Sequence, residues 1–261
     1  MPSNSVFEFF EVLCAELAGR EDVQVLDESN IGDDTLIEDL KKAFHQTDPA
    51  KAFDRGVNAI AAHFVEKDAK LPFSYDLPTR QFTPLDLEYL NFIALARGYR
   101  GSGANSKHFE TQTLHRLCKR LTGSLRCIGH PRDSRRRKAE FLSYLKDLGF
   151  NDNALEPYDK DGGFDILWLP PLGTIPLRPI VSIQCKNSSF NESDAAASTE
   201  RSARTFTRHS HLRRCGTMHL VVFNDYIDNR DYVGRATGWG FLPLGLSDLA
   251  QAVTLEHREV L

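Results

Sequence analysis

The sequence predicts an α/β (α+β) protein in which a helical N-terminal region precedes a mixed β-sheet flanked by helices. Two patterns predict this class. Apolar residues recur at helical spacing through the first half of the chain, and short apolar runs separated by turn residues dominate the second half. Gly123, Gly129 and Pro131 punctuate the chain between the halves. We therefore divide it into a helical region, residues 1–128, and a sheet-containing region, residues 129–261.

The expected helices of the first half have recognisable start and stop signals. Asp48 followed by Pro49 combines an N-cap residue with a proline at the first helical position, and Thr83 followed by Pro84 repeats that pair. Gly19 follows the first apolar stretch, where a glycine commonly ends a helix. The expected helices cover residues 5–18, 34–44, 49–66, 84–97 and 106–121.

The second half changes to the pattern of strands. After an expected helix at residues 134–148, which Ser134 caps and Gly149 ends, four apolar runs are separated by turn residues. A helix-like insert at residues 194–212 separates the second and third runs, and a short helix follows Ser247 and Asp248. The expected strands cover residues 164–169, 179–185, 218–223 and 239–244.

Composition excludes several classes of protein. The 261 residues are 41% hydrophobic and 26% charged, which is ordinary for a globular protein and not for a disordered or fibrous one. No apolar run approaches the ~18–20 residues that a membrane span needs. Glu8 and Glu11 interrupt the apolar stretch at the start, which does not fit a secretory signal. Five scattered cysteines, an odd number, do not form a disulfide framework, so we expect a cytoplasmic protein.

The net charge of −4 hides a strong segregation of charge. Residues 115–138 contain nine Lys or Arg and a single acid, Asp133, and residues 201–214 contain five Arg and no acid. Two concentrated basic stretches in an acidic chain indicate a surface that faces a polyanion, and we expect that polyanion to be nucleic acid.

The stretch that carries chemistry is the pair of strands around Asp165 and Gln184-Cys185-Lys186, which are separated by eighteen residues. We expect these strands to form a hairpin. Because side chains alternate along a strand, Gln184 and Lys186 share one face and Cys185 points to the other. If Asp165 lies opposite them, a carboxylate, an amide oxygen and an ammonium group converge.

These groups suit metal-assisted hydrolysis. Carboxylate and carbonyl oxygens are hard ligands for Mg²⁺, and a metal-bound water is acidic enough to attack phosphorus. A neighbouring lysine can orient or deprotonate that water. Gln184 is neutral where a second acid is usual, so we expect Glu140 to supply the missing charge as a third metal ligand. Asp161 and Glu156 are the next candidates for that acid.

The order of these segments resembles the catalytic core of PD-(D/E)xK nucleases, specifically Mrr-like restriction endonucleases with a Gln-x-Lys variant. The resemblance covers residues 134–225: a helix with Glu140, then DGGFDI, IVSIQCKN, a basic helix and HLVVFN. It implies a mixed sheet flanked by helices, Mg²⁺-dependent cleavage of DNA and frequent dimerisation. By the same resemblance Asp165 is the metal-binding aspartate, Gln184 the second ligand and Lys186 the catalytic lysine.

The function that follows is a Mg²⁺-dependent endonuclease of restriction type, acting on double-stranded DNA in a prokaryotic cytoplasm. Residues 1–128 would read or clamp the DNA, and residues 129–261 would cut it. Two alternatives stay open. One is an Mrr-like nuclease that is directed at modified DNA or activated as a phage-defence effector. The other is a non-catalytic DNA-binding protein that keeps a degenerate nuclease core.

Weaker patterns accompany this core. His115, Cys118, Cys127 and His130 have the spacing of a zinc site. We favour packing over zinc there, because Cys118 falls on the expected apolar face of its helix. The helices at 84–97 and 106–121 are candidates for a helix-turn-helix-like reader that turns His108 toward phosphates. The expected DNA-binding residues are Arg116, Lys119, Arg120, Arg135, Arg136, Arg137, Lys138, Arg201, Arg204, Arg208, Arg213 and Arg214.

Overall fold

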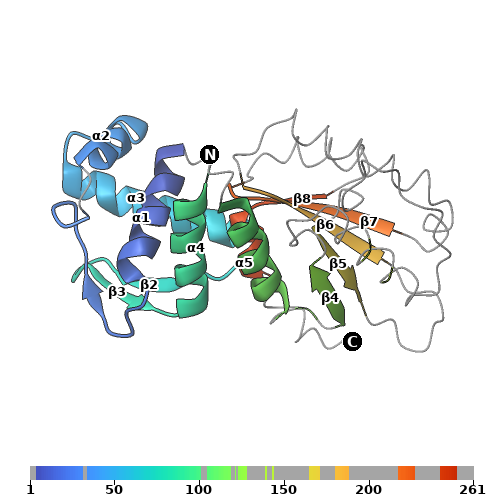
Figure 1. Cartoon of the computed structure of the whole chain (residues 1–261). Coiled ribbons are helices and arrows are strands. Elements are labelled where there is room, and N and C mark those ends of the chain that lie inside the picture. The colour runs from blue at the N-terminus through green and yellow to red at the C-terminus, as the bar shows by residue number, and fades with distance from the viewer. Residues whose placement is uncertain are drawn as a thin grey trace, which may run out of the picture. The chain divides into compact units, whose positions relative to one another are not determined.

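The computed structural model describes residues 4–31, 34–100, 105–118, 121, 123–127, 139, 143, 165–170, 180–187, 217–226 and 242–251. The chain divides into two compact units, Met1–Gly98 and Tyr99–Leu261. The boundary between the units, at residues 98 and 99, therefore precedes the expected boundary at residues 128 and 129. The reason is that helix α5 (Ser106–Cys118) and strand β4 (Ser124–Cys127) contact the strands of the second unit. Each unit combines helices with a sheet, which confirms the expected α+β class (Figure 1).

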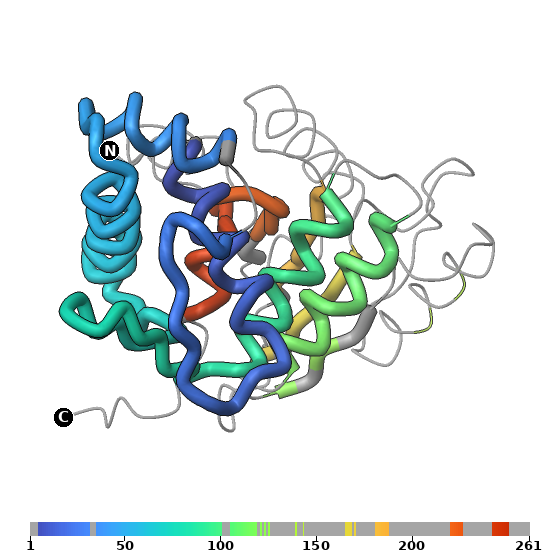
Figure 2. The backbone as a smooth tube through the Cα atoms, turned by 90° about the vertical axis from the view of Figure 1, so that its left-hand side faces the viewer, coloured from blue at the N-terminus to red at the C-terminus, as the bar shows by residue number. Residues whose placement is uncertain are grey.

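Four helices and a small sheet build the first unit. The helices are α1 (Asn4–Leu17), α2 (Asp34–Ala43), α3 (Pro49–Glu66) and α4 (Leu87–Tyr99), whose last residue already belongs to the second unit. Helices α1, α2 and α3 pack against one another (Figure 2). The contact between α1 and α3 is aromatic, with the Phe9 and Phe53 ring centroids 5.1 Å apart and those of Phe10 and Phe64 5.2 Å apart. This apolar contact forms the core of the unit.

Helix α3 begins where the sequence predicts. The Asp48 carboxylate accepts hydrogen bonds from the backbone N–H groups of Ala50 and Lys51, at 3.0 and 3.4 Å, and Pro49 occupies the first turn. The carboxylate accepts from backbone N–H groups that have no partner within the helix, and the proline has no N–H that would need one. The helix ends at Glu66, as expected.

The small sheet of the first unit was not expected. It consists of β1 (Gln24–Val25), β2 (Phe73–Asp76) and β3 (Gln81–Pro84), in the antiparallel order β1-β3-β2. The pair Thr83–Pro84, which was expected to open a helix, instead ends β3. Helix α4 begins three residues later at Leu87, where the Asp86 side chain accepts from the Tyr89 N–H at 2.9 Å.

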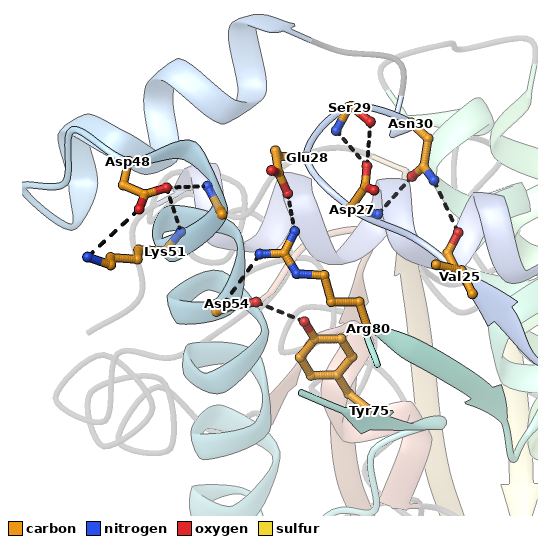
Figure 3. Close-up of polar contacts among 11 residues, drawn as sticks. Val25, Asp27, Glu28, Ser29, Asn30, Asp48, Lys51, Asp54, Tyr75 and Arg80 are labelled. Carbon is orange, nitrogen blue, oxygen red and sulfur yellow. Dashed lines mark hydrogen bonds and ion pairs between the residues drawn. The ribbon is translucent and has the colours of Figure 1, made fainter. Parts of the chain in front are cut away.

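An ion-pair cluster ties this sheet to the neighbouring elements of the first unit (Figure 3). Arg80 lies in the turn between β2 and β3, and its φ angle of 51° places its backbone in the left-handed region. Its guanidinium contacts Glu28 at 2.5 Å and Asp54 of α3 at 3.7 Å. The Tyr75 hydroxyl donates to Asp54 at 2.8 Å. The acids offset the charge of the arginine and hold the turn against α3.

A five-stranded sheet is the centre of the second unit, in the order β4-β5-β6-β7-β8. Strands β4, β5 (Ile166–Leu169) and β6 (Ile180–Lys186) form an antiparallel meander. Strands β7 (Thr217–Phe223) and β8 (Leu242–Leu244) continue the sheet in parallel to β6, and helix α10 (Leu246–Gln251) follows β8 (Figure 1). The four expected strands correspond to β5–β8, whereas β4 was not expected.

No helix among the described residues is long and apolar enough to cross a membrane.

Candidate active site

Strand pairing brings Asp165 to the Gln-x-Lys segment. Strand β5 pairs with β6 so that Ile166 lies opposite Ile183. Asp165, one residue earlier, lies just before the first paired residue of β5, and its side chain reaches the backbone of the Gln184-Cys185-Lys186 segment. The register thus gathers the three residue types that the sequence singled out at one end of the hairpin.

The Asp165 side chain continues the hydrogen bonding between the two segments beyond the last residue of β5 that pairs with β6. Its backbone N–H donates to the Ile183 carbonyl at 3.1 Å, and its Oδ2 accepts from the Cys185 N–H at 2.7 Å. A carboxylate thus replaces the backbone carbonyl that a longer β5 would have offered to Cys185. This bond fixes the carboxylate beside the Gln184-Cys185-Lys186 segment, and charge-assisted bonds of this kind are strong.

Gln184 is a buried polar residue. Only 6% of its surface is exposed, and its Oε1 has no hydrogen-bond partner among the described residues. A buried acceptor without a partner costs about 1–3 kcal/mol, so such groups usually have a purpose. An amide oxygen in this position suits a cation. Lys186, two residues along β6, lies on the same face and is half-buried.

The residues present fit a hard divalent cation. Asp165 contributes a carboxylate, and Gln184 contributes a buried amide oxygen whose need for a positive partner the described residues do not meet. Oxygen ligands of this kind are what Mg²⁺ prefers. No group of three or more His, Cys, Asp or Glu side chains that could hold a metal occurs within the described ranges. The acids expected as a third ligand, Glu140, Asp161 and Glu156, lie outside the described residues.

A second polar group, which the sequence analysis missed, follows the same strands. Asn187 comes directly after β6 and Asn224 directly after β7, and the Asn224 Nδ2 donates to the Asn187 Oδ1 at 2.8 Å. Arg100 donates from Nε to the Asn224 carbonyl at 2.8 Å. The available signal was an asparagine directly after each of two apolar strands, in IQCKN and LVVFN.

The structure contradicts the DNA-binding role expected for Arg116. It was expected to reach phosphates, but its side chain is buried, with 1% exposed. The buried side of α5 consists of Phe109, Thr113, Arg116 and Leu117. This stripe is rotated from the Leu114–Cys118 face that the sequence suggested, so the arginine points inward. A buried guanidinium supports the fold and does not offer itself to DNA.

The same rotation exposes Cys118. Cys118 is therefore not buried on an apolar helix face, and the packing role expected for it is wrong. Desolvation raises the pKa of its thiol, which disfavours the thiolate that zinc binds. Cys127 lies in β4 opposite Ile166, and His115 lies on α5. His130 is outside the described residues.

The proposed helix-turn-helix reader does not correspond to one unit of the fold. Residues 87–98 of helix α4 belong to the first compact unit and α5 to the second, whereas such a reader needs both helices in one unit. His108 is exposed on α5, and its ring stacks on Tyr99 at 5.6 Å.

The remaining expected DNA-binding residues lie outside the described residues. They are Lys119, Arg120, Arg135, Arg136, Arg137, Lys138, Arg201, Arg204, Arg208, Arg213 and Arg214.

Comparisons with known proteins do not assign a family. No protein-family model matches the chain, and no curated protein matches it. Among solved structures, the crystal structure of protein VC1899 from Vibrio cholerae is 13% identical, with a TM-score of 0.24. That match covers 97% of this chain and 56% of VC1899, so the chain spans little more than half the length of that protein. A TM-score this low carries no argument about fold or function.

Proposed function

We propose that this protein is a Mg²⁺-dependent endonuclease of restriction type, which hydrolyses phosphodiester bonds of double-stranded DNA. The observation that carries the proposal is the end of the β5–β6 hairpin, where Asp165 is fixed beside a buried Gln184 oxygen and Lys186 follows on the same face. A prokaryotic cytoplasm and a homodimer belong to this proposal through the resemblance to Mrr-like nucleases.

Each residue has a role in this proposal. Asp165 and Gln184, together with Glu140, would hold the Mg²⁺, which when bound neutralises phosphate charge and makes water more acidic. Lys186 would orient the attacking water or help to deprotonate it. The Cys185 N–H keeps the Asp165 carboxylate from rotating away, through their 2.7 Å bond. Positioning of this kind supplies a large share of the rate in phosphoryl-transfer enzymes.

The basic stretches at residues 115–138 and 201–214 would bind the DNA backbone, with Arg116 excluded by its burial. Lysines and arginines that contact phosphates displace counterions and give affinity without sequence preference. The first unit remains the candidate for recognition.

The test is cleavage of supercoiled plasmid by the purified full chain with Mg²⁺, with EDTA as the metal-free control. We expect cutting that EDTA stops, and a loss of about 10²–10⁴-fold in Lys186→Ala. Discrete fragments would indicate sequence-specific restriction. Cutting of methylated plasmid only would favour the nuclease directed at modified DNA. Binding without cutting under all metal conditions would overturn the proposal in favour of a non-catalytic DNA-binding protein.

A further inference from the structure

Two asparagines form an amide pair at the ends of β6 and β7. The parallel register places Lys186 beside Phe223, so that the next residues, Asn187 and Asn224, lie side by side. The Asn224 Nδ2 donates to the Asn187 Oδ1 at 2.8 Å. Asn224 is completely buried, with 0% exposed. Two neighbouring strands that both end at an asparagine, joined side chain to side chain, are held by more than apolar packing.

The surroundings determine which way both amides face. The Asn187 Nδ2 donates to the Tyr99 carbonyl, which can only accept. The Asn187 oxygen must then turn toward Asn224, and Asn224 must present its nitrogen. Arg100 holds the backbone of the same residue, since its Nε donates to the main-chain carbonyl of Asn224 at 2.8 Å. The pair therefore has one orientation and no equivalent flipped state.

This network reaches Lys186 directly. The backbone N–H of Asn224 donates to the Lys186 carbonyl at 2.9 Å. On the other side of β6, strand β5 begins at Ile166, and the Asp165 carboxylate just before it accepts from the Cys185 N–H at 2.7 Å. The position of Lys186 thus depends on Asp165 on one side and on Asn224 on the other.

We propose that Asn187 and Asn224 are positioning residues, which fix the backbone of Lys186 and through it the ammonium group at the reacting phosphate. This inference rests on the proposed nuclease function. Neither amide needs to touch the DNA or the metal. A displacement of about 1 Å in a reacting group can lower a rate about 10²-fold without changing ground-state binding. Loss of the pair should therefore reduce kcat and leave KM for DNA unchanged.

The experiment compares variants of the half-buried Asn187, because the fully buried Asn224 is less tolerant of change. Asn187→Ala removes the side-chain bonds to Tyr99 and to Asn224. Asn187→Asp keeps an oxygen for the Asn224 nitrogen but has no donor for the Tyr99 carbonyl. The control is Asp248→Ala, which removes a hydrogen bond from the Gly245 N–H, 2.7 Å long, elsewhere in the second unit. Steady-state cleavage in Mg²⁺ gives kcat and KM, and thermal unfolding gives the stability of each variant.

We expect Asn187→Ala to lower kcat about 10–100-fold with KM within twofold, Asn187→Asp to be faster than Asn187→Ala, and Asp248→Ala to keep the wild-type kcat. The inference is overturned if Asn187→Ala cuts at the wild-type rate, if its KM rises in place of a fall in kcat, if both Asn187 variants are equally slow, or if Asp248→Ala is slowed as much. These results would leave the nuclease assignment standing, provided that the wild type cuts and Lys186→Ala does not. Failure of the wild type to cut would instead remove the proposed function.

Discussion

At the scale of single residues, the second unit places polar groups where an ordinary sheet would place apolar ones. Gln184 is buried on a strand whose neighbours Ile183 and Val221 are buried too, and its amide oxygen has no partner among the described residues. Such a group lowers stability unless a ligand uses it. A buried oxygen retained at that cost is typical of functional sites, which often sacrifice stability.

Gln184→Met tests directly whether the buried amide oxygen lowers stability and is needed for cleavage. Methionine has a similar volume and no oxygen, so the variant loses the proposed metal ligand and, with it, a buried acceptor that has no partner among the described residues. We expect cleavage to fall below detection while the free energy of unfolding stays equal or rises by about 1 kcal/mol. Gln184→Glu, which keeps an oxygen ligand, should retain part of the activity. Plasmid cleavage and denaturant unfolding of both variants supply the test, and an active Gln184→Met would remove Gln184 from the metal site.

Tyr75 offers a prediction on pH. Burial, and then the hydrogen bond donated to Asp54, raise the pKa of its hydroxyl well above the ordinary value of about 10. The folded state therefore keeps the proton where the unfolded state loses it. The resulting stabilisation is complete below pH ~10 and decreases as the pH rises further. Tyr75→Phe should cost about 1 kcal/mol at neutral pH and should flatten the alkaline loss of stability. Denaturant unfolding between pH 8 and 11 checks this, and an unchanged alkaline slope would show that other groups cause it.

Part of the site could be predicted from residue patterns and part could not. Alternation along a strand was enough to place Gln184 and Lys186 on one face, and the hairpin was enough to bring Asp165 to them. The bond between Asn187 and Asn224 depends on the parallel pairing of β6 with β7. That pairing joins segments that are distant in the chain, so no local sequence pattern predicts it.

At the scale of elements, helices with explicit end signals were predictable and the shortest strands were not. Helix α3 has its bounds at the expected residues because Asp48 and Pro49 define its start chemically. Strand β1 has two residues and β2 and β3 have four each, too few for an alternating pattern to stand out. On α5 the polar residues Thr113 and Arg116 are buried, so an apolar stripe gave the wrong rotation of the helix.

Close packing of helices predicts the effect of changing Gly56 on α3. A Cβ at this position would lie 2.7 Å from Cε1 and 2.9 Å from Cδ1 of Phe9, whose ring is completely buried on α1. The gain in helix propensity is about 1 kcal/mol, but overpacking in a closed core costs about 1–3 kcal/mol. We expect Gly56→Ala to destabilise the protein, with a fall of several degrees in Tm.

Gly98, near the end of α4, is the matched control. No described atom lies within 4 Å of a Cβ built there, so Gly98→Ala changes propensity without a clash. It should leave Tm unchanged or raise it slightly. Thermal unfolding of both variants makes the comparison, and equal effects of the two substitutions would show that the approach of α1 to Gly56 is not close.

At the scale of the whole molecule, the distribution of charge matters more than its total. The net charge is −4, yet residues 201–214 alone carry five arginines and no acid. A basic segment of this kind raises the local concentration of a polyanion and makes binding depend on salt.

The salt dependence of DNA binding tests that role. If Arg201, Arg204 and Arg208 contact phosphates, replacing one of them with Ala should lower the slope of log K against log salt concentration by about one. Lys42→Ala is the control, because Lys42 is an exposed cation of the first unit paired with Asp39. Fluorescence anisotropy with a duplex at several salt concentrations gives the slopes. Slopes equal to wild type for all three arginine variants would show that this segment does not bind DNA.

Asp165 is the residue on which the proposed active site depends most, and one measurement tests its role directly. Asp165→Asn keeps an oxygen that can accept from the Cys185 N–H, so the hairpin should persist. It removes the negative charge that, in the proposed function, would hold the cation. The measurement is the single-turnover cleavage rate of duplex DNA by wild type and Asp165→Asn at saturating Mg²⁺. We predict a loss of at least about 100-fold in a variant that still unfolds cooperatively, with a modest fall in Tm because its bond from the Cys185 N–H is no longer charge-assisted. A variant that cuts at the wild-type rate would contradict the assignment of this hairpin as the active site.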